Sequence, residues 1–238
     1  MILFLGCSFT WGQGLYIDSW IESGIHPDII NSLEPPMYMA ENLSYEDDNI
    51  RKKYHFPNLV AKNLNRPYAT KFGNGGSNDD ILHILKNIDK LVIIEGIELV
   101  VIQLTHVLRD TSFTDYYTKN KQYDNYLNHY ITSVLDKIEF ICKDLGFDKS
   151  GNSIPIPYIV MSWHKDVADI CEEILGNRFL TFGKYNNIND LMNSNDNFKI
   201  SSKFKNIGDN HPSRECHSTI STYLIEKIKK LNIEFNTY

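Results

Sequence analysis

The sequence of 238 residues lacks the patterns that mark several classes of protein. Its four cysteines are far apart and form no CxxC pair, so neither a zinc site nor a disulfide framework is predicted, and a reducing compartment is the simpler expectation. No apolar run reaches the ~18 residues that a membrane helix needs. The eight histidines show no HxH or HExxH spacing, so we expect no metal ion and no other cofactor.

Basic charge is also scarce. The chain has 24 Lys and Arg against 30 Asp and Glu, a net charge of -6. Nucleic-acid backbones require clustered Lys and Arg, so a nucleic acid is not the expected partner. The amino-terminal segment MILFLGCSF is apolar but short and has no basic residue before it. It therefore indicates a buried strand rather than a signal peptide, and a protein that is cytoplasmic or otherwise soluble where it is made.

What the sequence does contain is an alternation of buried strands and amphipathic helices. Continuous apolar runs predict strands at residues 2–5, 99–104 and 156–163, with weaker ones at 67–70 and 179–182. Helical spacing covers 56–64, 78–88, 123–145, 167–175 and a last helix that begins at Pro212. This order predicts one α/β domain over residues 1–238, with a parallel sheet covered on both faces. Residues 16–54, rich in Pro and polar residues, are expected to form a long irregular insertion.

The segment GCSFTWG, residues 6–12, follows the first strand. Open α/β sheets bind ligands at the carboxyl ends of their strands, and Ser8 stands at such an end. Gly6 lets the chain turn sharply, and the N–H groups of the next turn face any negative charge that develops there. Ser8 is therefore a candidate nucleophile, although a serine that caps the next helix would give the same pattern.

Two further segments carry polar groups at junctions between strands and helices. In NGGSND, residues 74–79, the glycines can present N–H groups to an anion and Asn78 adds an amide donor. A plain turn with a helix cap is the alternative. In GDNHPS, residues 208–213, His211 is suited to act as a base near neutral pH, and Asp209 could orient its ring. A capped surface helix would also fit this second segment.

Together the three segments resemble the conserved blocks of the SGNH (GDSL-like) hydrolases: GCSFTWG the first block, NGGSND the second and GDNHP the last. The resemblance implies a flavodoxin-like three-layer α/β/α fold with about five parallel strands. It also implies ester hydrolysis through an acyl-enzyme. Ser8 would then be the nucleophile and one oxyanion donor, Gly76 a second donor (Gly75 if the register slips), His211 the base and Asp209 its acid.

The chain departs from that family pattern at three places. Cys7 stands where the family has an aspartate, and its side chain is expected to point away from the site. No GxND block follows residues 99–104, so its asparagine donor is missing. Asn78 is the candidate replacement, with Thr105 or His106 as weaker ones. Asp209 lies only two residues before His211 rather than three, so a backbone carbonyl could orient the ring instead.

Three residues near predicted strand ends are candidates for binding the substrate. Arg109 could bind a carboxylate through two parallel hydrogen bonds, although it could equally pair with Asp110 or Asp79. Thr105 and Trp11 are the other two candidates. Trp11, like Trp163 and His164, could stack on a sugar ring, although packing is the simpler interpretation of these aromatic residues.

The sequence therefore favours a serine esterase that acts on a small-molecule or glycan ester, and carbohydrate O-deacetylation is one candidate reaction. Two other interpretations remain open at this point. One is a binding or structural protein with the same fold and a decayed site, which the missing GxND block motivates. The other is an O-acyltransferase that uses the same serine and excludes water.

Overall fold

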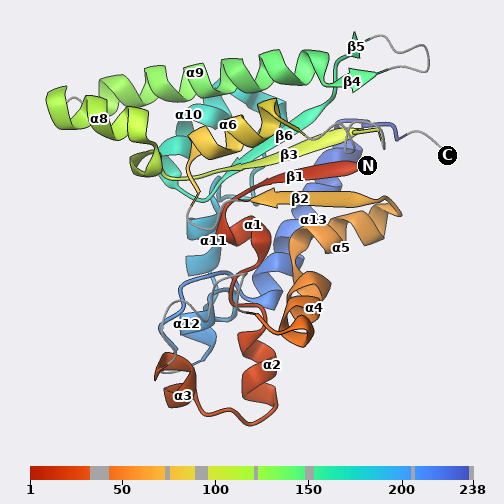
Figure 1. Cartoon of the computed structure of the whole chain (residues 1–238), viewed down its shortest axis with the longest axis vertical. Helices are drawn as coiled ribbons and strands as arrows, with labels where there is room; N and C mark the ends of the chain where they lie inside the picture. The colour runs from red at the N-terminus through yellow and green to blue at the C-terminus, as the bar shows by residue number, and fades with distance from the viewer. Residues whose placement is uncertain are drawn as a thin grey trace.

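The computed structural model describes residues 1–32, 43–72, 76–88, 96–120, 123–147, 153–204 and 207–235, and its centre is a parallel sheet of four strands (Figure 1). The strands lie in the order β2-β1-β3-β6, which is the 2-1-3-4 order of flavodoxin-like folds. Their bounds are Ile2–Gly6 (β1), Tyr68–Phe72 (β2), Leu99–Leu104 (β3) and Tyr158–Ser162 (β6). The expected fold class is confirmed.

Helices connect these strands. Those that precede β3 are α1 (Ser8–Trp11), α2 (Ile17–Glu22), α3 (Pro27–Ser32), α4 (Tyr45–Tyr54), α5 (Phe56–Leu64) and α6 (Asn78–Lys86). Those that follow β3 are η3 (Val107–Arg109), α8 (Thr111–Asn120), α9 (Tyr123–Asp144), α10 (Lys165–Leu175), η4 (Gly176–Arg178), α11 (Ile188–Asn193), η5 (Asp196–Phe198), α12 (Ile200–Lys203) and α13 (Arg214–Lys230). Between α9 and β6 a short antiparallel pair is formed by β4 (Gly146–Phe147) and β5 (Ser153–Ile154).

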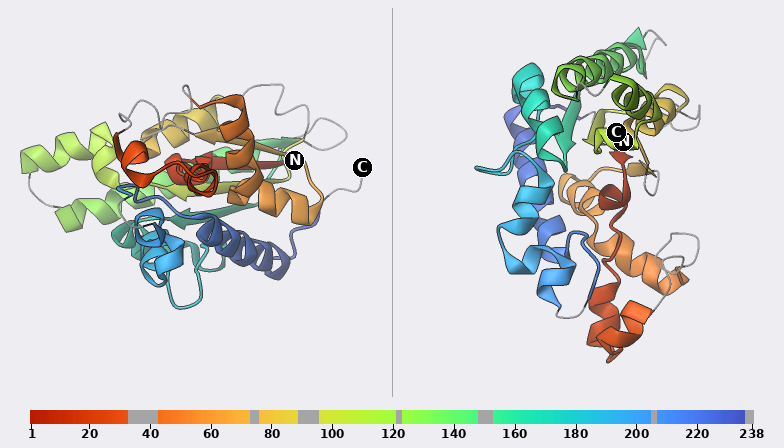
Figure 2. Two further views of the ribbon diagram at one scale, coloured as in Figure 1. Left: turned by 90° about the horizontal axis from the view of Figure 1, so that it is seen from below. Right: turned by 90° about the vertical axis from the view of Figure 1, so that its left-hand side faces the viewer.

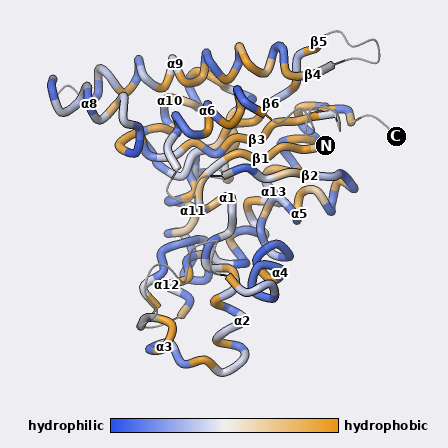
Figure 3. The backbone as a smooth tube through the Cα atoms, viewed as in Figure 1, coloured by the Kyte–Doolittle hydropathy of each residue, from blue (hydrophilic) through white to orange (hydrophobic). Residues whose placement is uncertain are grey.

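The sheet separates two apolar cores because successive strand residues point to opposite faces. Leu3 and Leu5 of β1 pack with α6, α8, α9 and α10, whereas Ile2 and Phe4 pack with α5, α11 and α13. Figure 2 shows α6 and α13 on opposite sides of the sheet, and Figure 3 shows how hydrophobic the buried strands are along their length. The molecule is thus a three-layer α/β/α sandwich.

Two expectations about the carboxyl-terminal half need correction. The fifth strand, expected at residues 179–182, is reduced to a single parallel bridge between Phe179 and Val160, because the chain turns away from β6 after Leu180. The last helix begins at Arg214 rather than at Pro212. Ser213 is its N-cap and accepts a hydrogen bond from the Cys216 N–H, so Pro212 lies before the helix.

The expectation that residues 16–54 are irregular is wrong for the part of this segment that the structure describes. It contains α2, α3 and α4, and the first two of these join α12 in a small bundle below the sheet (Figure 1). The core of the bundle consists of Tyr16, Ile17, Ile30, Ile200 and Ile207. Residues from both ends of the chain therefore form one apolar cluster.

An ion-pair cluster also holds this bundle together. The carboxylate of Asp18, on α2, is 2% exposed and lies 3.1 Å from Lys203 Nζ and 3.3 Å from Arg214 Nε. Burial raises the pKa of the Asp18 carboxyl, and the hydrogen bond from Lys203 opposes this shift. Lys203 ends α12 and Arg214 begins α13. The cluster thus fixes α2 against both helices that flank residues 204–213.

Within the described ranges, every helix is too short or too polar to cross a membrane.

Two histidines are buried beside α5. His217, on α13, is fully buried, and its Nδ1 accepts a hydrogen bond of 3.1 Å from the Phe56 N–H. His55 Nε2 lies 3.1 Å from the Tyr68 hydroxyl. Burial, the largest cause in both cases, lowers the pKa of each imidazole to about 3. Both rings are therefore neutral in the folded protein at pH 7 and remain so at pH 5.

These histidines make the free energy of unfolding depend on pH. Below pH 6.5, about the pKa of a histidine in the unfolded chain, these histidines bind protons in the unfolded chain but not in the folded one. Each histidine therefore lowers the free energy of unfolding by about 1.4 kcal/mol for each unit that the pH falls. In His217→Asn, whose Oδ1 can take the place of Nδ1, we expect a smaller loss of stability between pH 7 and pH 5 than in the wild type. Urea unfolding at both pH values measures it.

The matched control is His129→Gln on the exposed face of α9, which should lose as much stability as the wild type. A loss in His217→Asn equal to that of the wild type would contradict the neutral buried state of this ring.

Candidate active site

Ser8 lies at the junction between the central strand β1 and α1. It is the first residue of that short helix, directly beyond the carboxyl end of β1, and its side chain is 5% exposed. Its N–H group belongs to the first turn, where no earlier helical carbonyl is available to accept it. The turn ends at Gly12, whose φ of 84° is left-handed and favours glycine.

The structure brings His211 and Asp209 to this serine. His211 Nε2 lies 3.0 Å from Ser8 Oγ, and His211 Nδ1 lies 2.7 Å from Asp209 Oδ1. The same carboxylate oxygen accepts the backbone N–H of His211 at 2.8 Å. The short spacing of the two residues is therefore compatible with a serine–imidazole–carboxylate chain, because the loop folds back so that one carboxylate contacts both the ring and the backbone.

The loop that carries His211 is held mainly through its backbone. The N–H of Ile200 donates to the His211 carbonyl at 3.1 Å, and the N–H of Ser201 donates to the Asp209 carbonyl at 2.8 Å. Gly14 leaves room for the acid, since a Cβ there would lie 3.2 Å from Asp209 Oδ2 and 2.4 Å from Ile200 Cδ1. Sequence reasoning missed both α12 and Gly14, although the second glycine of GQG was visible.

Beneath the nucleophile a buried chain of hydrogen bonds ties α1 to β3. Thr10 Oγ1 donates to Gln103 Oε1 at 2.7 Å, and Gln103 Nε2 donates to Cys7 Sγ at 3.2 Å. Cys7 packs in the core on the α13 side and is not part of the Ser8–His211 contact. A glutamine inside the otherwise apolar strand β3 is the feature of the sequence that could have indicated this network.

Trp11 does not face the site. Its side chain is 1% exposed, and the Arg51 guanidinium lies 4.4 Å above its ring. Arg51, which is itself buried and paired with Asp48, also donates to the Trp11 carbonyl at 2.5 Å. The proposal that Trp11 binds substrate is therefore wrong, because its ring packs beneath an arginine from α4.

Asn78 is also used for structure. Its Nδ2 donates to the Thr105 carbonyl at 3.2 Å and to Asp110 Oδ2 at 2.7 Å, while its Oδ1 accepts the Thr105 N–H at 2.7 Å. Both amide protons are thus bound in the interior, and this contradicts the expectation that Asn78 is an oxyanion donor. Thr105 is fully buried in the same network, so its assignment as a substrate residue is wrong too. Burial raises the pKa of the Asp110 carboxyl, and the Asn78 hydrogen bond opposes this.

The other oxyanion candidates are backbone groups. Gly76 is buried and lies two residues before α6, after the carboxyl end of β2, which is parallel to β1. Gly75, the alternative register, lies outside the described residues. With the Asn78 amide occupied, the N–H groups of Ser8 and Gly76 remain as candidates, together with the weaker candidate His106.

Aromatic rings form a wall beside His211. The Phe9 ring lies 5.2 Å from that of His211 and 5.0 Å from that of Trp163, centroid to centroid. Farther along, the rings of His164 and His106 are 4.3 Å apart. These residues follow the carboxyl ends of β1, β3 and β6, so the wall crosses the end of the sheet. Sequence reasoning placed Trp163 and His164 near strand ends but did not identify Phe9.

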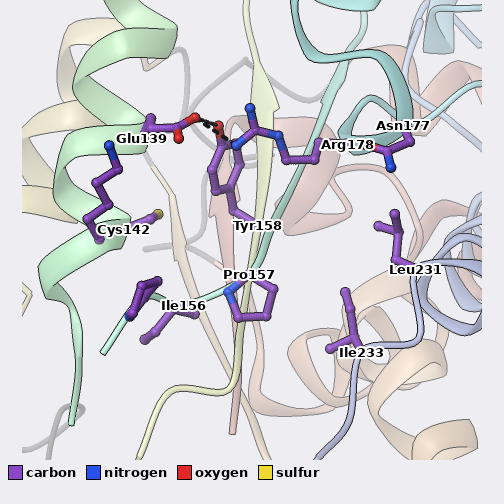
Figure 4. A pocket seen from close by; sticks show the side chains of 11 residues that line it. Glu139, Cys142, Ile156, Pro157, Tyr158, Asn177, Arg178, Leu231 and Ile233 are labelled. Carbon is purple, nitrogen blue, oxygen red and sulfur yellow. Dashed lines mark hydrogen bonds and ion pairs between the residues drawn. The ribbon is translucent and has the colours of Figure 1, made fainter. Parts of the chain in front are cut away.

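A cavity of about 420 Å³ lies at the opposite end of the sheet (Figure 4). It is lined by residues that precede β6, such as Pro157, and by Glu139, which accepts hydrogen bonds from the Tyr158 hydroxyl and from Arg178. Because Ser8 follows the carboxyl end of β1, this cavity is not part of the candidate active site. Nor do three or more His, Cys, Asp and Glu side chains gather as metal ligands anywhere in the described residues.

No family model matches the sequence, and no curated protein matches it. Solved structures do match. The chain is similar in fold to bacterial and metagenomic lipases.

One is an extracellular lipase from Streptomyces rimosus, with 13% identity and a TM-score of 0.47 over 96% of this chain and 98% of that one. Another is a putative lipolytic protein of the G-D-S-L family from Desulfitobacterium hafniense, with 12% identity and a TM-score of 0.45 over 95% and 98%. A third is the lipase Lip_vut3 from a goat rumen metagenome, with 13% identity and a TM-score of 0.46 over 95% and 96%.

The tight approach of α1 to β1 makes Gly6 sensitive to substitution. A Cβ at this position would lie 2.1 Å from Thr10 Oγ1 and 2.8 Å from Thr10 Cβ, and it would displace the side chain that binds Gln103. We expect Gly6→Ala to lower the free energy of unfolding by about 1–3 kcal/mol, the usual cost of overpacking. Urea unfolding checks this value.

Gly208 provides the control for this substitution. A Cβ there meets nothing within 4 Å, so Gly208→Ala should unfold like the wild type. Equal stability of the two variants would show that the backbone at Gly6 can shift to accept a Cβ without a measurable loss of stability.

Proposed function

We propose that this protein is a serine esterase whose nucleophile is Ser8, whose base is His211 and whose acid is Asp209. The observation that carries the proposal is the continuous chain of contacts from Ser8 Oγ to the Asp209 carboxylate, with distances of 3.0 Å and 2.7 Å. Each member occupies the place that its role requires: the base contacts the nucleophile, and the acid contacts the far nitrogen of the base.

In the first half of the reaction Ser8 Oγ attacks the ester carbonyl carbon while His211 Nε2 takes the hydroxyl proton. The tetrahedral intermediate collapses to an acyl-Ser8 ester, and the departing alkoxide takes that proton from His211. In the second half His211 takes a proton from water as the water attacks the acyl carbon. The acid is released and Ser8 recovers its proton. Asp209 stays ionised throughout and stabilises the imidazolium.

The negative charge on the carbonyl oxygen needs donors that are already oriented. Backbone N–H groups of Ser8 and Gly76 are the proposed pair, since the Asn78 amide is bound to Thr105 and Asp110. The resemblance of GCSFTWG and NGGSND to the SGNH blocks supports the same pair. An oxyanion hole without a side-chain amide would distinguish this protein from the family pattern.

The acyl group proposed for the substrate is small, with an O-acetyl group on a carbohydrate as one candidate. Ser8 is only 5% exposed and the Phe9 ring packs against that of His211, so the space around the nucleophile is restricted. Aromatic residues along the wall offer faces on which a sugar ring could stack.

Labelling with a fluorophosphonate probe, read by intact mass, tests the proposal. We expect one adduct on the wild-type protein and none on Ser8→Ala or His211→Ala, since the probe reacts only with an activated serine. Ser202→Ala, an exposed position on α12, should label like the wild type. A folded wild-type protein that takes no adduct would overturn the proposal in favour of a binding protein with a decayed site.

Replacement of the acid separates its role from that of the base. Asp209→Asn preserves the size of the side chain but can donate to His211 Nδ1, which leaves the proton on Nε2 and makes that nitrogen unable to accept from Ser8. We expect turnover of an activated ester such as 4-nitrophenyl acetate to fall on the order of 10⁴-fold. A fall of less than about tenfold would mean that another group, such as a backbone carbonyl, orients the ring.

A further inference from the structure

The geometry points to a substrate class: we propose that the ester carries a carboxylate and that Arg109 binds it. This inference rests on the proposed esterase function and adds to it the charge of the substrate. It concerns the ring wall beside His211 and the one arginine stacked on that wall.

Arg109 is linked to the proposed base by a series of ring contacts. It ends η3, the single turn that follows β3, and its guanidinium carbon lies 5.5 Å from the centroid of the Trp163 ring. Trp163 contacts Phe9, and Phe9 contacts His211, at ring separations of 5.0 Å and 5.2 Å. These contacts form a continuous series from the guanidinium through two rings to the base. In the proposed complex, a substrate with its ester at Ser8 extends along this wall toward Arg109.

The carboxylates that seemed available to Arg109 are bound elsewhere. Asp110 accepts hydrogen bonds from the Asn78 side chain and backbone, and it is fully buried. Asp79 accepts from the Ser112 hydroxyl at 3.0 Å and from the Tyr130 hydroxyl at 3.3 Å. Across the described ranges no acidic side chain forms an ion pair with Arg109. By contrast, the nearby Lys165 is paired with Asp169 at 2.8 Å.

An exposed guanidinium stacked on an indole is prepared to bind a planar anion. The ring lies beside the guanidinium, and no acceptor for its N–H groups is found among the residues that the structure describes. A carboxylate matches an edge of this group with two parallel hydrogen bonds. Stacking also reduces the conformational freedom that an arginine loses on binding. Lysine could supply the charge but not the paired geometry.

His106 adds a neutral donor on the same wall. Its Nδ1 accepts the Leu108 N–H at 3.2 Å, so a neutral ring carries its proton on Nε2. Burial first, and then the neighbouring His164, lower the pKa of the His106 imidazole. The carboxylate of Asp166 lies beside these rings, 3.9 Å from His164 Nδ1. Among the described residues, the wall thus presents the Arg109 cation beside a hydrogen-bond donor.

The test compares two neutral esters with anionic counterparts of similar size. On the acyl side, 4-nitrophenyl butyrate is compared with the 4-nitrophenyl monoester of succinic acid. On the alcohol side, 4-carbamoylphenyl acetate is compared with 4-carboxyphenyl acetate. Values of kcat and KM are measured for the wild type, Arg109→Gln, Arg109→Lys and the charge-matched control Lys165→Gln, with thermal unfolding as a check on folding.

In Arg109→Gln we expect kcat/KM for the anionic ester of at least one pair to fall about 10- to 100-fold, the worth of a charged hydrogen-bonded contact. The neutral ester should change less than about twofold, and the loss should lie mainly in KM. Arg109→Lys should recover part of the activity, and Lys165→Gln should behave like the wild type. Should Arg109→Gln fail to fold, Arg109→Lys still tests the paired geometry.

An unchanged ratio of anionic to neutral kcat/KM in both Arg109 variants, for both pairs, would overturn the inference while leaving the esterase function intact. Failure of the esterase function itself has a different signature: the wild type then takes no fluorophosphonate adduct and hydrolyses none of the four esters.

Discussion

The hydrogen bond between Ser8 Oγ and His211 Nε2 joins residues that are 203 positions apart, and the rest of the structure is arranged to hold its two ends. One end is fixed by the sheet, because β1 lies between β2 and β3 and can move only with them. The other end is fixed by α12, whose backbone N–H groups bind the carbonyls of Asp209 and His211. A proton transfer of this kind depends on short distances, so both supports are conditions for any chemistry at Ser8.

The sequence predicted those parts of the fold that follow from local patterns. The apolar run at residues 99–104 became β3 with the expected bounds, and the helical spacing at 56–64 became α5. The prediction that residues 16–54 are irregular failed because the helices in this segment are stabilised by tertiary contacts, such as Tyr16 and Ile17 packing against Ile200. A local hydrophobic period does not reveal such contacts. The prediction of a fifth strand failed because the apolar run at residues 179–182 does not reveal that, within this run, only Phe179 forms a bridge with β6.

In the candidate site, too, the sequence predicted what local patterns reveal and not what distant contacts decide. Polar residues at the predicted junctions between strands and helices indicated Ser8, Asp209 and His211, which the structure brings together. Asn78 was misjudged because its partner, Asp110, lies 32 residues farther along the chain. An asparagine two residues after a pair of glycines looks like a free donor in the sequence, but in the fold a buried carboxylate binds its amide. Trp11 was misjudged in the same way, since Arg51 covers it from a segment that was expected to be irregular.

The support of His211 by α12 has a consequence for the order in which the protein is made. A nascent chain that has emerged as far as Ser162 contains all four strands of the sheet and the nucleophile, but neither the base nor the helix that positions it. The bundle that contains α12 also needs α2, which is synthesised earlier. The buried carboxylate of Asp18 on α2 can form its ion pairs only after Lys203 and Arg214 have been made. Ser8 therefore has no imidazole partner until His211 has been made and α12 has packed beside it, so the Ser8–His211 contact cannot form when the four strands first come together.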